Sequence, residues 1–179
     1  MIITVSGPPG SGKSTLSKTV ADHFRLTLIS SGDVFRAMAE ERGVGLEEFG
    51  KIAESDPVID KAIDKRQMEL SKHSGDFLFE GRLSGWFIEA DLKIMLKTDV
   101  EVRARRISQR EEISFKQAMH ETMIRQQSEA KRYKDYYNID IADLTPYDLV
   151  MESSVWDPEA TAKIAITAIE LMKEKRQRG

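Results

Sequence analysis

The chain has 179 residues, of which 40% are hydrophobic and 32% charged, with no cysteine and a formal net charge of −3. This length fits one domain with a substantial core, and the lack of cysteine excludes disulfides and thiolate metal sites. The acidic balance argues against broad nucleic-acid binding. No segment approaches the ~20 apolar residues of a membrane helix, and no basic region precedes an apolar run at the N-terminus. We therefore expect a cytoplasmic monomer that engages neither membrane nor nucleic acid.

Short apolar runs alternate with longer helical patterns along the chain. We expect five strands, at residues 2–5, 26–29, 77–79, 92–96 and 147–151. Continuous apolar runs separated by helices indicate a parallel sheet covered on both faces. The predicted fold class is therefore α/β, with a five-stranded parallel sheet in three layers, as a single domain over residues 1–179.

A glycine-rich segment follows the first expected strand and leads into a helical pattern over residues 14–24. This strand, loop and helix order is the context of a phosphate-binding P-loop, whereas a plain turn would not explain the Lys-Ser pair. The glycines let several backbone N–H groups point at one anion, beside the positive end of a helix dipole. Lys13 can reach the terminal phosphates of a nucleoside triphosphate, and the Ser14 hydroxyl can ligate Mg²⁺. The predicted nucleotide-binding residues are Gly7, Pro8, Pro9, Gly10, Ser11, Gly12, Lys13, Ser14 and Thr15.

Two further regions add helical segments beyond those that a minimal parallel sheet requires. Residues 33–73 lie between the second and third strands, carry helical signals and break at residues 43–45 and 56–57. This excursion is either a substrate cap or packing, and its place after a strand favours the cap. Residues 102–137 are strongly charged and helical.

The last helix is expected to begin at Asp157-Pro158, with Asp157 as N-cap, and the basic tail at 173–179 is expected to fray. Its apolar face comprises Ala162, Ala165, Ile166, Ile169 and Met172.

Two arginines follow strands whose carboxyl ends should lie beside the P-loop. Arg36 comes shortly after the second strand, in the segment that begins at Ser30, and Arg82 comes after the third. A guanidinium there offers a planar fork that matches phosphate oxygens. Either arginine could simply extend from the sheet rim into solvent. Two at equivalent strand ends favour a phosphate site.

The charged region holds two groups of residues with helical spacing. Arg103, Arg106 and Arg110 share one helix face, which is typical either of a solvated helix or of arginines that close over a migrating phosphoryl group. Arg125, Glu129 and Arg132 share another face. Glu129 could hold both arginines, accept a hydrogen bond from a base amino group or a sugar hydroxyl, or belong to a surface salt-bridge ladder.

The remaining residues with chemical potential fit packing better than catalysis. The three histidines are scattered without ligand spacing, so we expect no dedicated metal site. Trp86 and Trp156 are expected to be packing residues rather than nucleotide stackers. Three tyrosines on the end of a helix are expected in the core or at its rim: Tyr133, Tyr136 and Tyr137.

Taken along the whole chain, these motifs resemble the nucleoside monophosphate kinases, and among them the cytidylate kinases of the short archaeal type. The P-loop alone is shared by many families, and the segment at residues 30–36 is shared with adenylate kinases. The set of Arg125, Glu129 and Arg132 is the more specific pointer to cytidine. The resemblance is carried by residues 7–15, 30–36, 79–83, 102–111, 125–133, 137–141 and 147–150.

The resemblance implies an ATP:CMP phosphotransferase of the P-loop NTPase fold that uses Mg²⁺ and CMP, with dCMP as a further acceptor. A helical insert at about residues 33–73 would bind the monophosphate, and a lid at about residues 103–115 would close over it. Lys13 would bridge the terminal phosphates of ATP, while Arg106 and Arg110 would neutralise the migrating group. The residues implied to bind the acceptor are Ser31, Arg36, Arg82, Arg125, Glu129 and Arg132.

The sequence also departs from the wider family. Bacterial cytidylate kinases carry an acid where this chain has Leu83, so contacts that depend on that acid cannot be carried over. The insert differs in length as well, which leaves the base-selecting contacts unassigned. A kinase of the same architecture acting on AMP, UMP, shikimate or dephospho-coenzyme A is the nearest alternative. A nucleotide switch is a more distant one, because arginines suited to a second phosphate occupy the space that its sensing elements would need.

Overall fold

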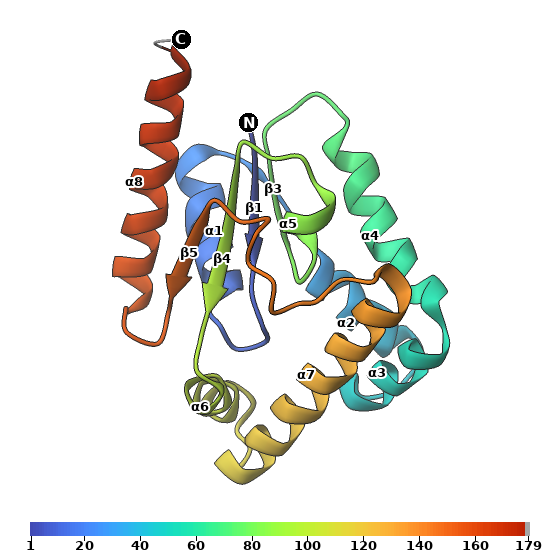
Figure 1. Cartoon of the computed structure of the whole chain (residues 1–179). Helices are drawn as coiled ribbons and strands as arrows, with labels where there is room; N and C mark the ends of the chain where they lie inside the picture. The colour runs from blue at the N-terminus through green and yellow to red at the C-terminus, as the bar shows by residue number, and fades with distance from the viewer. Residues whose placement is uncertain (178–179) are drawn as a thin grey trace.

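The computed structural model describes residues 1–177 and shows a three-layer α/β fold around a five-stranded sheet (Figure 1). The strand order is β2-β3-β1-β4-β5, and every neighbouring pair is parallel. The predicted fold class is confirmed, and each predicted strand overlaps an observed one with its ends shifted. The strands are β1 Ile2–Ser6, β2 Thr27–Ser30, β3 Phe77–Gly81, β4 Leu92–Lys97 and β5 Leu149–Glu152.

The helices begin where the sequence supplies capping groups. Ser30 Oγ accepts a hydrogen bond from Asp33 N at the start of α2, and Asp157 caps α8 through Ala160 N, as predicted. Asp56 and Pro57 separate α3 from α4. The helices are α1 Lys13–Phe24, α2 Ser31–Glu41, α3 Leu46–Ser55, α4 Pro57–Ser71, α5 Ser84–Phe87, α6 Val100–Glu111, α7 Phe115–Tyr137 and α8 Pro158–Gln177.

The main core lies between one face of the sheet and helices α1 and α8. Helices α1 and α8 pack against each other on one face, whereas α4 and α5 lie on the opposite face. The predicted apolar face of α8 is confirmed, because Ala162, Ala165 and Ile169 are buried and Ile166 and Met172 pack beside them. Helix α8 continues through Gln177, so the predicted frayed tail is helical over most of its length, and residues 178–179 lie outside the described residues.

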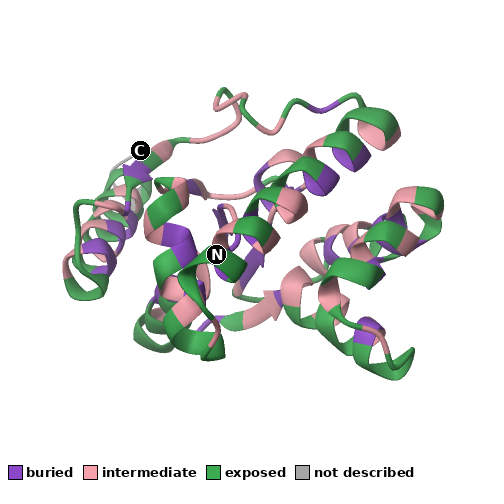
Figure 2. Cartoon of the chain, turned by 90° about the horizontal axis from the view of Figure 1, so that it is seen from below, coloured by how far each residue is buried: buried purple, intermediate pink, exposed green. Residues whose placement is uncertain are grey.

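The segment from α2 to α4 has a separate apolar core. Its centre is Phe49, which is fully buried together with Ala53 and is contacted by residues of all three helices. Buried positions line the inner sides of these helices, while their outer faces are exposed (Figure 2). Helix α7 connects this unit to the rest of the molecule, since Tyr136 Oη donates to Ala53 O at 2.6 Å and Lys131 pairs with Glu54 at 3.1 Å. The predicted helical excursion is therefore a subdomain with its own packing.

All five strands end at the same edge of the sheet because they are parallel. The P-loop, the start of α2, Arg82, the start of α6 and the connection from β5 to α8 consequently converge there. Within residues 1–177, no helix combines the length and the apolar character needed to cross a bilayer.

Candidate active site

A cavity of about 330 Å³ opens at the carboxyl edge of the sheet. It brings together many of the predicted site residues, although they come from five separate segments of the chain. Of the predicted P-loop residues, Gly7 and Pro8 do not line it. Its walls include Pro9, Gly10, Ser11, Gly12, Lys13, Ser14, Thr15, Ser31, Arg36, Arg82, Arg106, Arg110 and Arg125. Glu129 and Arg132 line a smaller hollow that continues from it.

The P-loop adopts the curled backbone that its glycines permit. Gly10 and Gly12 have φ angles of 78° and 89°, in the left-handed region that side chains rarely enter. A Cβ added at Gly10 would lie 2.9 Å from the carbonyl oxygen of Arg103, so close packing by α6 also requires glycine there. Helix α1 then begins at Lys13, which places its positive dipole end at the cavity. This arrangement fits the binding of an anion.

The side chain of Lys13 is 14% exposed and lines the cavity. Burial lowers the pKa of Lys13 to about 8, although Glu80, whose Oε1 lies 3.9 Å from Nζ, acts in the opposite direction. Nearby arginines lower the pKa further. A phosphate group at this place would favour the charged ammonium, because an opposite charge nearby stabilises the ionised form.

Glu80 is a candidate residue that the sequence analysis did not single out. Its carboxylate, near the end of β3, is buried and accepts a hydrogen bond from Ser14 Oγ at 2.9 Å. A hydroxyl and a carboxylate in contact fit Mg²⁺, which is held by few protein oxygens beside substrate phosphates and waters. Among the described residues, no group of three or more acidic, histidine or cysteine side chains is arranged as a metal site. The sequence did hold a signal for Glu80, because an acidic residue near the end of an otherwise apolar strand is unusual.

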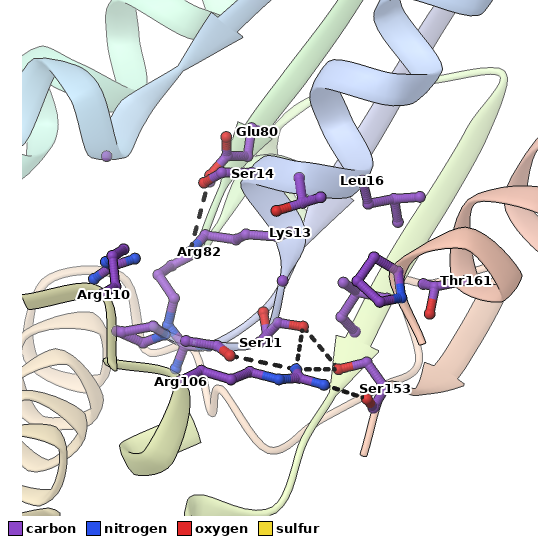
Figure 3. A pocket seen from close by; sticks show the side chains of 18 of the residues that line it. Ser11, Lys13, Ser14, Leu16, Glu80, Arg82, Arg106, Arg110, Ser153 and Thr161 are labelled. Atoms are coloured by element: carbon purple, nitrogen blue, oxygen red, sulfur yellow. Dashed lines mark hydrogen bonds and ion pairs between the residues drawn. The ribbon is translucent and has the colours of Figure 1, made fainter. Parts of the chain in front are cut away.

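Arg106 joins α6 to the P-loop. Its guanidinium donates to Ser153 O at 2.7 Å and Ser153 Oγ at 3.2 Å, and also to Ser11 O at 3.3 Å (Figure 3). Ser153 Oγ in turn donates to Ser11 O at 2.7 Å. Arg106 therefore lines the cavity while holding the β5–α8 connection against the phosphate loop.

The other two arginines of α6 that were predicted to face the phosphoryl group, Arg103 and Arg110, have opposite surroundings. Arg103 is 3% exposed and donates to Gln126 Oε1 at 2.6 Å, so it is not part of a solvated face. Arg110 is exposed, pairs with Glu111, and stands apart at the edge of the cavity (Figure 3). The alternative of a solvated helix thus fits Arg110 but is wrong for Arg103.

Glu129 connects arginines from two elements. It is 3% exposed, and its Oε1 accepts from Arg125 Nε at 3.1 Å. Its Oε2 lies 2.7 Å from Arg82 Nε, an ion pair whose atoms are not aligned as a hydrogen bond. Burial would raise the pKa of Glu129, but Arg82, Arg125, Arg132 and Lys13 together hold it below its usual value. Glu129 is therefore an ionised residue at the junction of the two predicted phosphate sites.

The predicted pairing of Glu129 with Arg132 is corrected by the structure. Arg132 Nη1 instead donates to both carboxylate oxygens of Asp60 at 2.9 Å, across the interface between α7 and α4. Both side chains are buried, so the alternative of a surface salt-bridge ladder is also wrong for Arg132. Sequence spacing pointed to the nearest acid on the same helix, whereas the fold supplies a closer one from the helical insert.

Arg36 and Ser31 lie in the first turns of α2 and line the cavity. Arg36 is half exposed and pairs with Asp33 one turn earlier. Ser31 lines both the main cavity and the smaller hollow. The two residues thus lie where the main cavity narrows towards the insert.

The expectation for aromatic residues is confirmed except at one position. Trp86 packs beside Tyr133 and Leu83 in a small apolar cluster. Tyr137 contributes to the same cluster and donates through its hydroxyl to Asp64 Oδ2 at 2.6 Å. Trp156 is 48% exposed and lines the cavity, so the expectation that it is a packing residue is wrong.

Comparison with known proteins agrees with this geometry. Residues 2–155 match the cytidylate kinase-like family. The chain is 51% identical to the cytidylate kinase of Methanothrix thermoacetophila over 97% of its length and 100% of that protein. It is 45% identical to the cytidylate kinase of Archaeoglobus fulgidus, with 98% of each chain covered.

Solved structures share the fold at low sequence identity. A shikimate kinase from Bacteroides thetaiotaomicron is 15% identical with a TM-score of 0.59, covering 95% of this chain and 98% of that one. An uncharacterised protein from Eubacterium ventriosum is 18% identical with a TM-score of 0.67 over the same shares of the two chains. These likenesses support the three-layer P-loop architecture. The extent and identity of the sequence matches show that the chain belongs to the cytidylate kinase-like family.

Proposed function

We propose that this protein transfers the γ-phosphoryl group of ATP to CMP, and to dCMP, giving ADP and the pyrimidine diphosphate. One observation carries the proposal: a P-loop and a second group of arginines face each other across one cavity. The relatives named cytidylate kinase and the family match support the choice of substrate.

The donor half is the P-loop with its neighbours. Backbone N–H groups and Lys13 hold the β- and γ-phosphates of ATP. Ser14 and Glu80 are the residues that would hold Mg²⁺, which would supply positive charge to offset that of the phosphates. Trp156 and Pro158 stand beyond the P-loop, where the adenosine end of the donor extends. Arg106 keeps this wall in place through Ser153.

The acceptor half holds the monophosphate opposite the γ-phosphorus. Arg36, Arg82 and Arg125 bind its phosphate, and Glu129 orients two of them. A phosphate oxygen of CMP attacks the γ-phosphorus in line, and the bond to the oxygen that bridges the β- and γ-phosphorus atoms breaks. The acceptor needs no general base because the second pKa of a phosphate monoester is about 6.

The division of the chain follows from these roles. Residues 33–73 form the acceptor-binding insert, supported by the separate core of α2 to α4. Residues 103–115 form the lid, in which Arg110 is free to move over the phosphates because its side chain is exposed. Closure excludes water from the phosphoryl group, which suppresses hydrolysis of ATP.

A coupled assay for ADP across several acceptors tests the proposal. With ATP and Mg²⁺, we expect CMP and dCMP to give the highest kcat/KM among CMP, dCMP, UMP, AMP, shikimate and dephospho-coenzyme A. A higher kcat/KM for AMP or shikimate would show that the protein is a related kinase with another acceptor. Hydrolysis of ATP that no acceptor stimulates would favour a nucleotide switch.

A further inference from the structure

The main cavity continues into a smaller hollow between α2, α4 and α7. The two spaces share Ser31, Gly32, Arg82 and Arg125, so they form two compartments of one site. If the acceptor phosphate lies at Arg82 in the first, the nucleoside end extends towards the second. The inference below rests on the proposed function and concerns how the base is recognised there.

The hollow is lined by buried ionic groups around an aromatic ring. Asp60 is fully engaged, since both of its oxygens accept from Arg132. Arg132 is 4% exposed, yet its Nε has no hydrogen-bond partner. Its guanidinium carbon lies 5.4 Å from the centre of the Phe35 ring, which also lines the hollow. A buried N–H without a partner costs free energy unless a ligand satisfies it.

Asp64 supplies the complementary acceptor. Its Oδ2 accepts from Tyr137, and within residues 1–177 no other donor reaches its carboxylate. Burial raises the pKa of Asp64 to about 7, with Asp60 acting in the same direction, while Tyr137 and Arg132 act against it. A ligand that donates a hydrogen bond to the second oxygen would stabilise the ionised carboxylate.

We infer that Asp64 and Arg132 read the edge of the pyrimidine ring, with Asp64 accepting from the 4-amino group of cytosine and Arg132 Nε donating to N3 or O2. Cytosine presents a donor at position 4 and acceptors at N3 and O2, which matches this carboxylate and guanidinium pair. Uracil presents a carbonyl oxygen at position 4, which a carboxylate repels. Phe35, whose ring lies under the Arg132 guanidinium, borders the same hollow. The hollow is therefore the compartment that selects cytosine over uracil.

The substitution Asp64→Asn tests this assignment with little change in shape. In this variant the hydroxyl of Tyr137 donates to the carbonyl oxygen of the new side-chain amide, which leaves the amide N–H group facing the base. We expect the ratio of kcat/KM for CMP to kcat/KM for UMP to fall at least about tenfold, the scale of one base-edge contact. The dissociation constants of CMP and UMP, measured by calorimetry, should show the same shift even if turnover is lost.

Three results would overturn the inference. The first is a CMP to UMP ratio in Asp64→Asn that stays within about twofold of the original protein, in both turnover and binding. The second is a change confined to the ratio of CMP to dCMP, which would place Asp64 at the sugar. The third is an unmodified protein that phosphorylates neither CMP nor UMP, which would refute the proposed function as well.

A matched control lies in a neighbouring hollow between α3 and α7. Thr122 lines that space, is buried and has no hydrogen-bond partner for its hydroxyl, but it does not border the compartment of Asp64. Thr122→Val should leave the CMP to UMP ratio unchanged. A shift in Thr122→Val without one in Asp64→Asn would place the base between α3 and α7 and contradict the assignment.

Discussion

The proposed donor and acceptor halves of this site are built in different ways. The proposed donor half is almost continuous in sequence, since residues 9–15 line the cavity and include Lys13. The acceptor half is assembled from α2, α4, the end of β3 and α7, and it depends on buried ion pairs such as Asp60 with Arg132. In the proposed function, one half would bind phosphate mainly through a local backbone shape, whereas the other would depend on side chains held by the tertiary fold.

This difference separates the expected consequences of mutation. A change in the donor half should remove activity and leave the fold intact, because the loop conformation is set by its glycines. A change in the acceptor half should affect stability and activity together, because its charges are paired inside the protein.

The largest effect is expected from Lys13→Met. We predict a fall in kcat of about 10³-fold, because a preorganised positive charge at the migrating phosphoryl group is lost. The free energy of unfolding should change little. Lys18→Met, at an exposed position of the same helix, is the matched control and should retain full turnover. Retention of most turnover by Lys13→Met would break the assignment of the donor half.

Arg132→Leu should instead destabilise the protein. The change leaves Asp60 buried without its cation, which should cost about 3–5 kcal/mol in the free energy of unfolding measured with urea. Lys131→Leu, which removes an exposed partner of Glu54 on the same helix, should cost less than about 1 kcal/mol. The double variant Asp60→Leu with Arg132→Leu should recover much of the stability. Equal costs for the two single variants would contradict the contrast between buried and exposed pairs.

The pKa of Lys13 predicts a pH-dependent signature of ATP binding. At pH 8 about half of the Lys13 side chains are neutral in the free protein, because burial lowers the pKa to about 8. The ATP phosphates raise this pKa, so binding should take up about half a proton more than in Lys13→Met. Calorimetry in two buffers of different ionisation enthalpy measures this difference. Equal proton uptake in both proteins would show that the Lys13 ammonium does not meet the phosphates.

The smallest effect is expected at the outer end of the donor half. Trp156→Ala should raise the KM for ATP about tenfold with kcat nearly unchanged, since stacking on a base stabilises ground and transition states alike. Val155→Ala, at an exposed neighbour that does not line the cavity, is the control. An unchanged KM in Trp156→Ala would place the adenosine elsewhere.

The sequence predicted the features that depend on local sequence, and it failed at those that depend on the tertiary fold. Apolar runs identified all five strands, and the glycine-rich segment identified the loop between β1 and α1, because both signals are local. Asp60 was missed because it lies 72 positions from Arg132, and only the packing of α4 on α7 brings the two together. Trp156 was assigned to packing, although its exposure depends on how the β5–α8 connection passes the P-loop. Pairings across elements and the orientation of loop residues require the tertiary fold.

The central claim is that the two halves hold two nucleotides at once, facing each other. The most direct measurement is calorimetric titration with adenosine and cytidine joined through five phosphates. We predict one molecule bound per chain, at least about 100-fold more tightly than ATP or CMP alone, because the linked ligand fills both halves with one loss of translational freedom. Binding no tighter than that of ATP, together with competition between ATP and CMP for a single site, would contradict the account.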